Sequence, residues 1–280
     1  MLIFLNGEFV SEAEATVSVM DGGLQYGYGV FETIRAYRGK PFRFAQHLDR
    51  LKRSAAVLDI PFLDEGIENK VLRLIAENTT GEAYVRITAT SGPLRHFSRP
   101  PEGFSLIVRV TEPCLPPAQA YENGISCTIS GACQDESSPL VPIKSLCFLP
   151  RLLVKKEAQK RGFDEAIMLN RRQQLTEASS SNLFFVMDGI LRTPNLESGI
   201  LQGITRAVVL EVCAHLGIPV REGAYSAQDM ERATEAFLTN SISEILPIAS
   251  LGGKPVGEGK PGKITKALAQ GYREQISRES

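Results

Sequence analysis

The sequence predicts an α/β protein of the α+β type with two domains, and three features support this prediction. Its 280 residues exceed the length of about 100 to 200 residues of a usual single domain. Strand-like and helical stretches alternate along the chain. Residues 112–124, EPCLPPAQAYENG, contain three prolines and no hydrophobic periodicity, which is typical of a linker. We therefore expect a small N-terminal domain over residues 1–117 and a larger domain over residues 118–280.

The N-terminal domain is predicted to begin with two hairpins, followed by two helices and two strands. Asn6-Gly7 and Arg38-Gly39 each separate two strand-like runs, and such pairs suit tight turns. Helical spacing of apolar residues follows in HLDRLKRSAAVLDI and IENKVLRLIAENT, before the strands EAYVRITAT and FSLIVRV. In the C-terminal domain we expect the strands ISCTIS, DEAIMLN, SNLFFVM and EAFLTN with the helices PRLLVKKEAQKRG and TRAVVLEVCAHLG.

Composition narrows the class of protein. The chain has 43% hydrophobic residues and a net charge of -1, so no overall field favours nucleic acid or an anionic membrane. Five cysteines without a CxxC pair and three scattered histidines form neither a disulfide framework nor a metal site. The apolar start MLIFL is short for a signal peptide, and no run approaches the roughly 20 residues that span a bilayer. We expect a cytoplasmic protein.

Lys144 is a candidate nucleophile because it lies in the mostly apolar stretch LVPIKSLCFLPRLL. Apolar surroundings disfavour the ammonium form, and a neutral amine attacks carbonyl groups. The alternative is an ordinary surface lysine whose stem covers apolar neighbours. This segment alone favours the surface lysine.

Glu177 precedes three serines and a buried-looking strand in LTEASSSNLFFV. A carboxylate in such a place can pair with a protonated heterocyclic nitrogen, as a pyridoxal ring requires when it withdraws electrons. The same residues also fit a turn with a serine cap.

Two stretches have features of a phosphate site. In GILQGITR a helix begins after Gly203, so that Ile204 and Thr205 would present backbone N–H groups and a hydroxyl to an anion. The turn at residues 238–241 could add donors, and Arg50 could add a planar guanidinium. An ordinary helix start and a solvated arginine are the alternatives.

The spacing GxxxxGK at residues 257–263 resembles a nucleotide-binding loop. We reject that interpretation, because Ile264 stands where the magnesium-binding serine or threonine would be, and no clear buried strand leads into the loop.

Taken in order, these features resemble the class IV (fold-type IV) pyridoxal-phosphate aminotransferases, which include branched-chain and D-amino-acid aminotransferases and 4-amino-4-deoxychorismate lyase. Six blocks carry the resemblance over nearly the whole chain: LQYGYGVFETIRAYRGKPFRFAQHLDRL, IKSLCFLPRLLVKKEAQKRGFDEAIMLN, LTEASSSNLFFV, GILQGITR, LTNSISEILPI and GKPGKITKAL. The resemblance implies a small α/β domain and a larger domain with a barrel-like sheet, with pyridoxal 5'-phosphate (PLP) between them, in a homodimer.

The resemblance also implies residue roles. Lys144 would carry PLP as a Schiff base and move the substrate proton, and Glu177 would bind the pyridine nitrogen. The phosphate would be bound by Arg50, Ile204, Thr205 and Ser241, and two neighbouring residues, Gly203 and Ile242, would also bind the cofactor. The substrate pocket would include Tyr26, Phe31 and the segment from Thr90 to Arg99, with Arg95 and His96 as carboxylate ligands.

Two departures from the family pattern are visible. Many members have a tyrosine four or five residues after the lysine, where this chain has Phe148 and Leu149. The spacing of Arg95, His96 and Arg99 differs by about one residue from the carboxylate trap of D-amino-acid enzymes, so these residues can also be loop cations.

We expect an aminotransferase that moves an amino group from a branched-chain or D-amino acid to a 2-oxo acid such as 2-oxoglutarate. The first alternative is the lyase, because GVFETIRAYRGKPF and LTNSISEILPI resemble both classes. The second is a binding protein that keeps the fold without turnover. The partners expected are small amino acids and 2-oxo acids, with no nucleic acid and no membrane.

Overall fold

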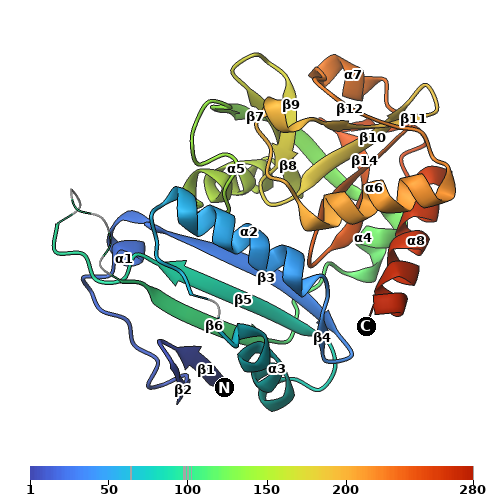
Figure 1. Cartoon of the computed structure of the whole chain (residues 1–280). Helices are drawn as coiled ribbons and strands as arrows, with labels where there is room; N and C mark the ends of the chain where they lie inside the picture. Colours follow the sequence, from blue (N-terminus) through green and yellow to red (C-terminus); the bar gives the residue numbers. More distant parts are fainter. Residues whose placement is uncertain (64, 97–98, 100, 102, 280) are drawn as a thin grey trace. The chain divides into compact units, whose positions relative to one another are not determined.

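A computed structural model of the chain describes residues 1–63, 65–96, 99, 101 and 103–279 (Figure 1). The chain forms two compact units. The first contains Met1–Cys114, Ile143–Phe148 and residues 278–279, and the second contains Leu115–Pro142 and Leu149–Ser277. The first change of unit lies three residues before the boundary expected after residue 117. The structure differs from a simple division into two segments, because the stretch with Lys144, expected in the C-terminal domain, belongs to the first unit.

The first unit is built on a six-stranded antiparallel sheet in the order β2-β1-β6-β5-β3-β4. The strands are β1 (Leu2–Leu5), β2 (Glu8–Ser11), β3 (Gly29–Tyr37), β4 (Lys40–Pro41), β5 (Ala83–Thr90) and β6 (Ser105–Thr111). Both expected hairpins are present. Asn6, Gly7, Arg38 and Gly39 all have positive φ angles, as tight hairpin turns require.

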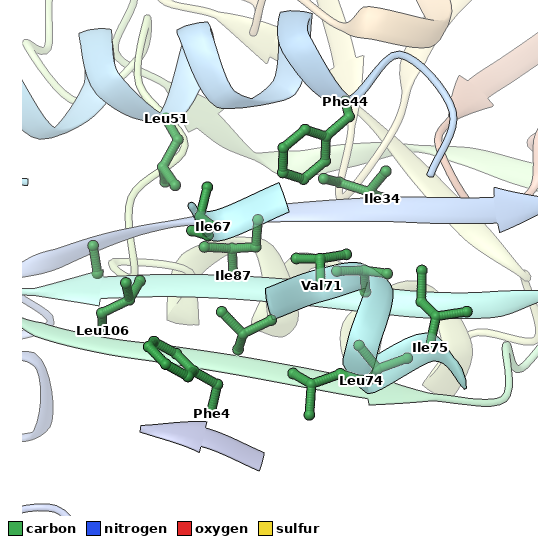
Figure 2. Close-up of a cluster of buried hydrophobic side chains, with 14 of the residues drawn as sticks. Phe4, Ile34, Phe44, Leu51, Ile67, Val71, Leu74, Ile75, Ile87 and Leu106 are labelled. Atoms are coloured by element: carbon green, nitrogen blue, oxygen red, sulfur yellow. The ribbon is translucent and has the colours of Figure 1, made fainter. Parts of the chain in front are cut away.

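Two helices cover one face of this sheet and bury its core. They are α2 (Phe44–Val57) and α3 (Ile67–Asn78), and a short helix α1 (Gly22–Tyr26) precedes β3. Figure 2 shows Leu51 of α2 and Leu74 of α3 among the buried side chains, with Ile34 of β3 and Ile87 of β5. Because side chains alternate along a strand, Phe31 of β3 points to the opposite face from Ile34.

The second unit is a closed barrel with added strands. Six strands follow one another in the order β10-β13-β14-β7-β8-β9, and β9 returns to pair with β10 through Glu177 and Asn182. The ring consists of β7 (Ile125–Gln134), β8 (Glu165–Asn170), β9 (Leu175–Ala178), β10 (Asn182–Met187), β13 (Glu235–Asn240) and β14 (Glu244–Leu251). The barrel-like sheet expected for the larger domain is thus present, and its closing pair contains Glu177.

The remaining elements of the second unit extend or cover the barrel. Strands β11 (Ile190–Pro194) and β12 (Val220–Gly223) extend it from β10, and β15 (Lys254–Pro255) pairs with β14. The helices are α4 (Ala118–Asn123), α5 (Leu149–Lys160), the 3-10 turn Leu196–Ser198, α6 (Ile204–Leu216), α7 (Ala227–Glu231) and α8 (Lys263–Glu279), whose last residues are grouped with the first unit. Among the described residues, no helix combines the length and the apolar character needed to cross a membrane.

Candidate active site

In the first unit, Lys144 lies on a segment that runs beside the edge of β3. The backbone N–H of Phe31 donates to the carbonyl of Lys144 at 2.9 Å, and the N–H of Leu146 donates to the carbonyl of Gly29 at 2.8 Å. This edge is open to the segment because β4 pairs only with Ala36 and Tyr37, at the other end of β3. Strand-like pairing therefore fixes the backbone that carries the lysine.

The amine of Lys144 lies over an aromatic ring in the same unit. Its Nζ is 4.8 Å from the ring centroid of Phe31, and the side chain is half-buried. The ring of Phe148 meets Phe31 edge-on, with centroids 5.9 Å apart. Phe148, one of the two positions at which the resemblance led us to look for a tyrosine, thus makes an apolar contact.

Sequence reasoning missed Arg86 of β5, whose guanidinium lies 3.9 Å from the ring centroid of Phe31. Phe31 therefore has both a lysine amine and a guanidinium near its ring. Arginine is suited to binding carboxylates, which every amino acid carries. The signal that could have revealed Arg86 is an arginine in the middle of the strand AYVRITAT, between buried alternate residues.

The other residues expected in the substrate pocket lie differently. Tyr26 is exposed at the end of α1, and Arg95 and His96 are exposed in the loop after β5. Phe97 and Ser98, which the expected segment from Thr90 to Arg99 includes, are outside the described residues. Of the expected pocket residues, Phe31 contacts Lys144 through its ring, whereas Tyr26, Arg95 and His96 are exposed.

Arg50 is held by a buried carboxylate on the other face of β3. Its Nε and one terminal nitrogen donate to the two oxygens of Glu32, each at 2.7 Å, and His47 Nδ1 lies 2.7 Å from Glu32 Oε2. Burial alone would raise the pKa of Glu32, but Arg50 and His47 hold that pKa far below its ordinary value. Burial is the main cause that lowers the pKa of His47, although Glu32 opposes it. We therefore assign a neutral His47 that donates from Nδ1, next to a fixed arginine cation.

In the second unit, Glu177 is buried where the barrel closes. Its Oε1 accepts from Arg151 at 2.6 Å, and its Oε2 accepts from Asn182 Nδ2 at 2.9 Å and from the backbone N–H of Leu201 at 3.2 Å. The donors come from α5, β10 and the segment before α6. Glu177 is therefore a carboxylate fixed from three directions.

The beginning of α6 has the features of an anion site. Gly203 occupies the N-cap, and no side chain caps the helix. A Cβ atom at Gly203 would overlap Asn182 Oδ1, so the close approach requires glycine at this position. Thr205 is buried in the first turn. The free N–H groups and the dipole of a helix start favour phosphate here.

The turn after β13 provides further polar groups. Asn240 Oδ1 accepts from the backbone N–H groups of Ile242 and Ser243 at 2.9 and 2.7 Å, which fixes the turn that contains Ser241. Thr239, directly across from Asn182 in the barrel, has a buried hydroxyl without a hydrogen-bond partner in the described part of the chain. A buried hydroxyl without a partner is costly unless a ligand satisfies it. Together with the uncapped helix, these groups fit a phosphate-bearing cofactor.

The rejected GxxxxGK stretch is occupied by the protein itself. Glu235 accepts from the backbone N–H groups of Ile264 and Thr265 at the start of α8, at 3.1 and 2.7 Å. A carboxylate therefore takes the place that a nucleotide phosphate would need.

Comparison with known proteins identifies the family. A family model described as amino-transferase class IV matches residues 29–251. The chain belongs to this family. A D-alanine aminotransferase from Listeria monocytogenes is 37% identical over 286 residues, covering 99% of this chain and 97% of the relative.

Solved structures of class IV aminotransferases share the fold. The branched-chain amino acid aminotransferase from Escherichia coli superposes with a TM-score of 0.94 at 32% identity, covering 100% of this chain and 95% of that one. A branched-chain aminotransferase from T.th., solved with pyridoxamine 5'-phosphate, has a TM-score of 0.91 at 30% identity, with the same coverage. The expected family and fold are confirmed, and the chain is an enzyme of the aminotransferase family.

Proposed function

We propose that this enzyme uses PLP to move an amino group from a branched-chain or D-amino acid to a 2-oxo acid such as 2-oxoglutarate. The observation that carries the proposal is the placement of Lys144. A backbone paired with β3 fixes this lysine, and its amine lies near the ring of Phe31, which the guanidinium of Arg86 also approaches. An amine for the cofactor and a cation for a substrate carboxylate are the two groups that amino-group transfer needs.

Each cofactor contact has residues suited to it. Lys144 would bind the cofactor's carbonyl carbon and later hold the proton removed from the substrate Cα. Glu177 would accept the ring N–H. The phosphate ligands would be Arg50, Ile204, Thr205 and Ser241, with Gly203 and Ile242 as further cofactor-binding residues. When bound, PLP supplies an electron sink for the substrate carbanion.

We assign Phe31 to the substrate pocket, and we keep Tyr26, Arg95 and His96 as proposed substrate residues. Phe31 is supported by its contact with Lys144. The others are exposed, so that a bound substrate or a partner subunit would have to cover them.

A homodimer is also proposed, and exposed apolar side chains support it. Leu149, Leu152 and Leu153 are exposed along one side of α5, and Val19 and Leu24 are exposed near α1 in the first unit. Large apolar side chains gathered on a surface are typical of protein interfaces. Light scattering of the purified protein would test the dimer, and a monomer at micromolar concentration would contradict it. The expected cytoplasmic location stays a prediction.

The first experiment tests the cofactor lysine. Purified protein with PLP should show a visible absorption band, and borohydride should fix the cofactor to Lys144, as peptide mapping can show. Lys144→Ala should lose both the fixation and about a thousandfold in activity. The matched control is Lys156→Ala, an exposed lysine of α5, which should keep both. Fixation of the cofactor in Lys144→Ala would overturn the assignment.

The second experiment separates transfer from elimination. Incubation with L- or D-amino acids plus 2-oxoglutarate should give glutamate. Incubation with aminodeoxychorismate should give no 4-aminobenzoate. Pyruvate and 4-aminobenzoate from the second mixture alone would establish the lyase, and the chirality of the accepted amino acid would give the stereospecificity.

A further inference from the structure

Arg151 is a residue that the assigned roles do not explain. It is the third residue of α5, and its guanidinium donates to Glu177 Oε1 at 2.6 Å. The same guanidinium reaches the carbonyl of Ala178 and the side-chain oxygen of Gln134, both at 3.4 Å. Its side chain is 23% exposed, whereas that of Glu177 is 3% exposed. A partly exposed cation therefore lies directly on a buried carboxylate.

The hydrogen bonds to Glu177 leave one place for another donor. A carboxylate has about four lone-pair positions, two on each oxygen. Asn182 and Leu201 use both positions on Oε2, and Arg151 uses one on Oε1. The remaining position is on Oε1, the oxygen that Arg151 already holds. Any further donor that binds Glu177 in this geometry must share an oxygen with the guanidinium.

Removal of Arg151 would leave Glu177 in place. Asn182 and Leu201 still anchor Oε2, and Asn182 also donates to the carbonyl of Leu201 at 2.9 Å. The contribution of Arg151 is therefore mainly its charge. Two cations on one carboxylate oxygen repel each other, and the interior of a protein screens that repulsion less than water does.

We propose that Arg151 is a positioning residue that acts through Glu177 and weakens the bond between Glu177 and the protonated ring nitrogen of PLP. The inference rests on the proposed function, because it needs Glu177 to meet that nitrogen. The positive charge of Arg151 partly neutralises the carboxylate of Glu177, so the attraction between Glu177 and the ring N–H is weaker. The arginine thus sets how strongly the ring is held in its protonated, electron-withdrawing form.

The test uses binding to the protein without cofactor and requires no activity. The probes are PLP and its 1-deaza analogue, in which a C–H group replaces the ring nitrogen. The ratio of their dissociation constants isolates the ring-nitrogen contact, because a general loss of structure weakens both ligands alike. Fluorescence titration of the wild type, Arg151→Met, Arg151→Lys and Glu177→Gln gives this ratio.

We expect Arg151→Met to raise the preference for PLP over the 1-deaza analogue about tenfold, because the competing charge is gone while partial exposure limits the effect. Arg151→Lys keeps the charge and should stay within about twofold of the wild type. Glu177→Gln should reduce the preference at least about tenfold. The matched control is Lys155→Met on the same helix, which breaks an ion pair of 3.2 Å to buried Glu165 and should leave the preference unchanged.

The possible failures are distinguishable. An unchanged or lowered preference in Arg151→Met, with Glu177→Gln behaving as expected, would overturn the role of Arg151 alone. An equal preference in the wild type and Glu177→Gln would show that Glu177 does not meet the ring nitrogen, which overturns both assignments. A wild type that binds neither ligand would overturn the proposed function.

Discussion

The two units each contain an arginine bound to a buried carboxylate, and the two pairs differ in what surrounds them. In the first unit, Arg50 and His47 both come from α2, and with Glu32 they form a group that is almost completely buried. In the second unit, the donors to Glu177 come from three separate segments, and Arg151 is partly exposed. Both partners of the first pair are buried, whereas in the second pair the carboxylate keeps a lone pair available and the arginine is partly exposed.

The difference shows two roles that a carboxylate can have in a site: it can orient another group, or it can itself be oriented by its neighbours. Glu32 orients a cation, since it binds two nitrogens of Arg50 and leaves the rest of that guanidinium to other partners. Glu177 is itself the oriented group. A pair that is buried on both sides is costly to break, while a partly exposed partner can turn to water. Stability should therefore depend on the first pair, and ligand binding on the second.

The largest expected effect follows from breaking the first pair. Glu32→Gln keeps the shape of the side chain but removes the negative charge that the buried Arg50 guanidinium contacts. We expect the free energy of unfolding to fall by about 3 to 5 kcal/mol. Glu177→Gln should cost only about 1 kcal/mol, because Arg151 reaches solvent. Urea denaturation of the protein without cofactor measures both.

A third arginine–carboxylate pair provides the control. Arg35 of β3 binds Glu82, the residue just before β5, whose side chain is 44% exposed. Glu82→Gln should cost about 1 kcal/mol or less. If Glu32→Gln were no more costly than Glu82→Gln, the buried group around Arg50 would not have the special stability that we assign to it.

The second largest expected effect concerns Gly203, which packs against Asn182, a hydrogen-bond donor to Glu177. Gly203 has φ -72° and ψ 136°, which alanine adopts freely, but a Cβ would overlap Asn182 Oδ1. Gly203→Ala should therefore displace the amide that binds Glu177, with a loss of about 1 to 3 kcal/mol in unfolding free energy and weaker PLP binding. Fluorescence titration and urea denaturation measure the two effects.

Gly131 of β7 is the matched control for Gly203. It also has no positive φ angle, and a Cβ there meets nothing within 4 Å. Gly131→Ala should change the stability by about 0.5 kcal/mol or less and leave PLP binding unchanged. Equal behaviour of the two alanine variants would contradict the close approach at Gly203.

The sequence predicts the local features of this molecule better than its long-range ones. Turn pairs such as Asn6-Gly7 have a local cause, and so do the apolar repeats of α2 and α3, so the sequence alone predicts them. The missed α8 also has a readable repeat, in which Leu268, Tyr272 and Ile276 are buried at intervals of four residues. Short strands such as β9 lack enough residues for a pattern.

The arrangement of the site depends on contacts that no single segment contains. Lys144 pairs with β3 more than a hundred residues earlier, which places its segment in the first unit against expectation. Glu177 and Arg151 are 26 residues apart and meet only because α5 and β9 belong to one folded unit. Family resemblance supplied the expected role of Glu177, but it assigned no role to Arg151, although Arg151 lies in one of the blocks that carry the resemblance.

The smallest expected effect concerns His47 in the first pair. Folding lowers the pKa of His47 below its ordinary 6.5, so between the two values the unfolded chain binds more protons than the folded one. This contribution to stability is complete above pH 6.5 and is lost as the pH falls below it, with a slope of up to about 1.4 kcal/mol per pH unit. Glu32 has a lowered pKa too, and its contribution is lost only below pH 4.5.

His47→Asn keeps an N–H donor near the position of Nδ1 but does not titrate. The variant should therefore show a flatter dependence of unfolding free energy on pH below 6.5 than the wild type. Urea denaturation at several pH values measures this slope. An identical slope in both proteins would mean that His47 is not the neutral donor to Glu32.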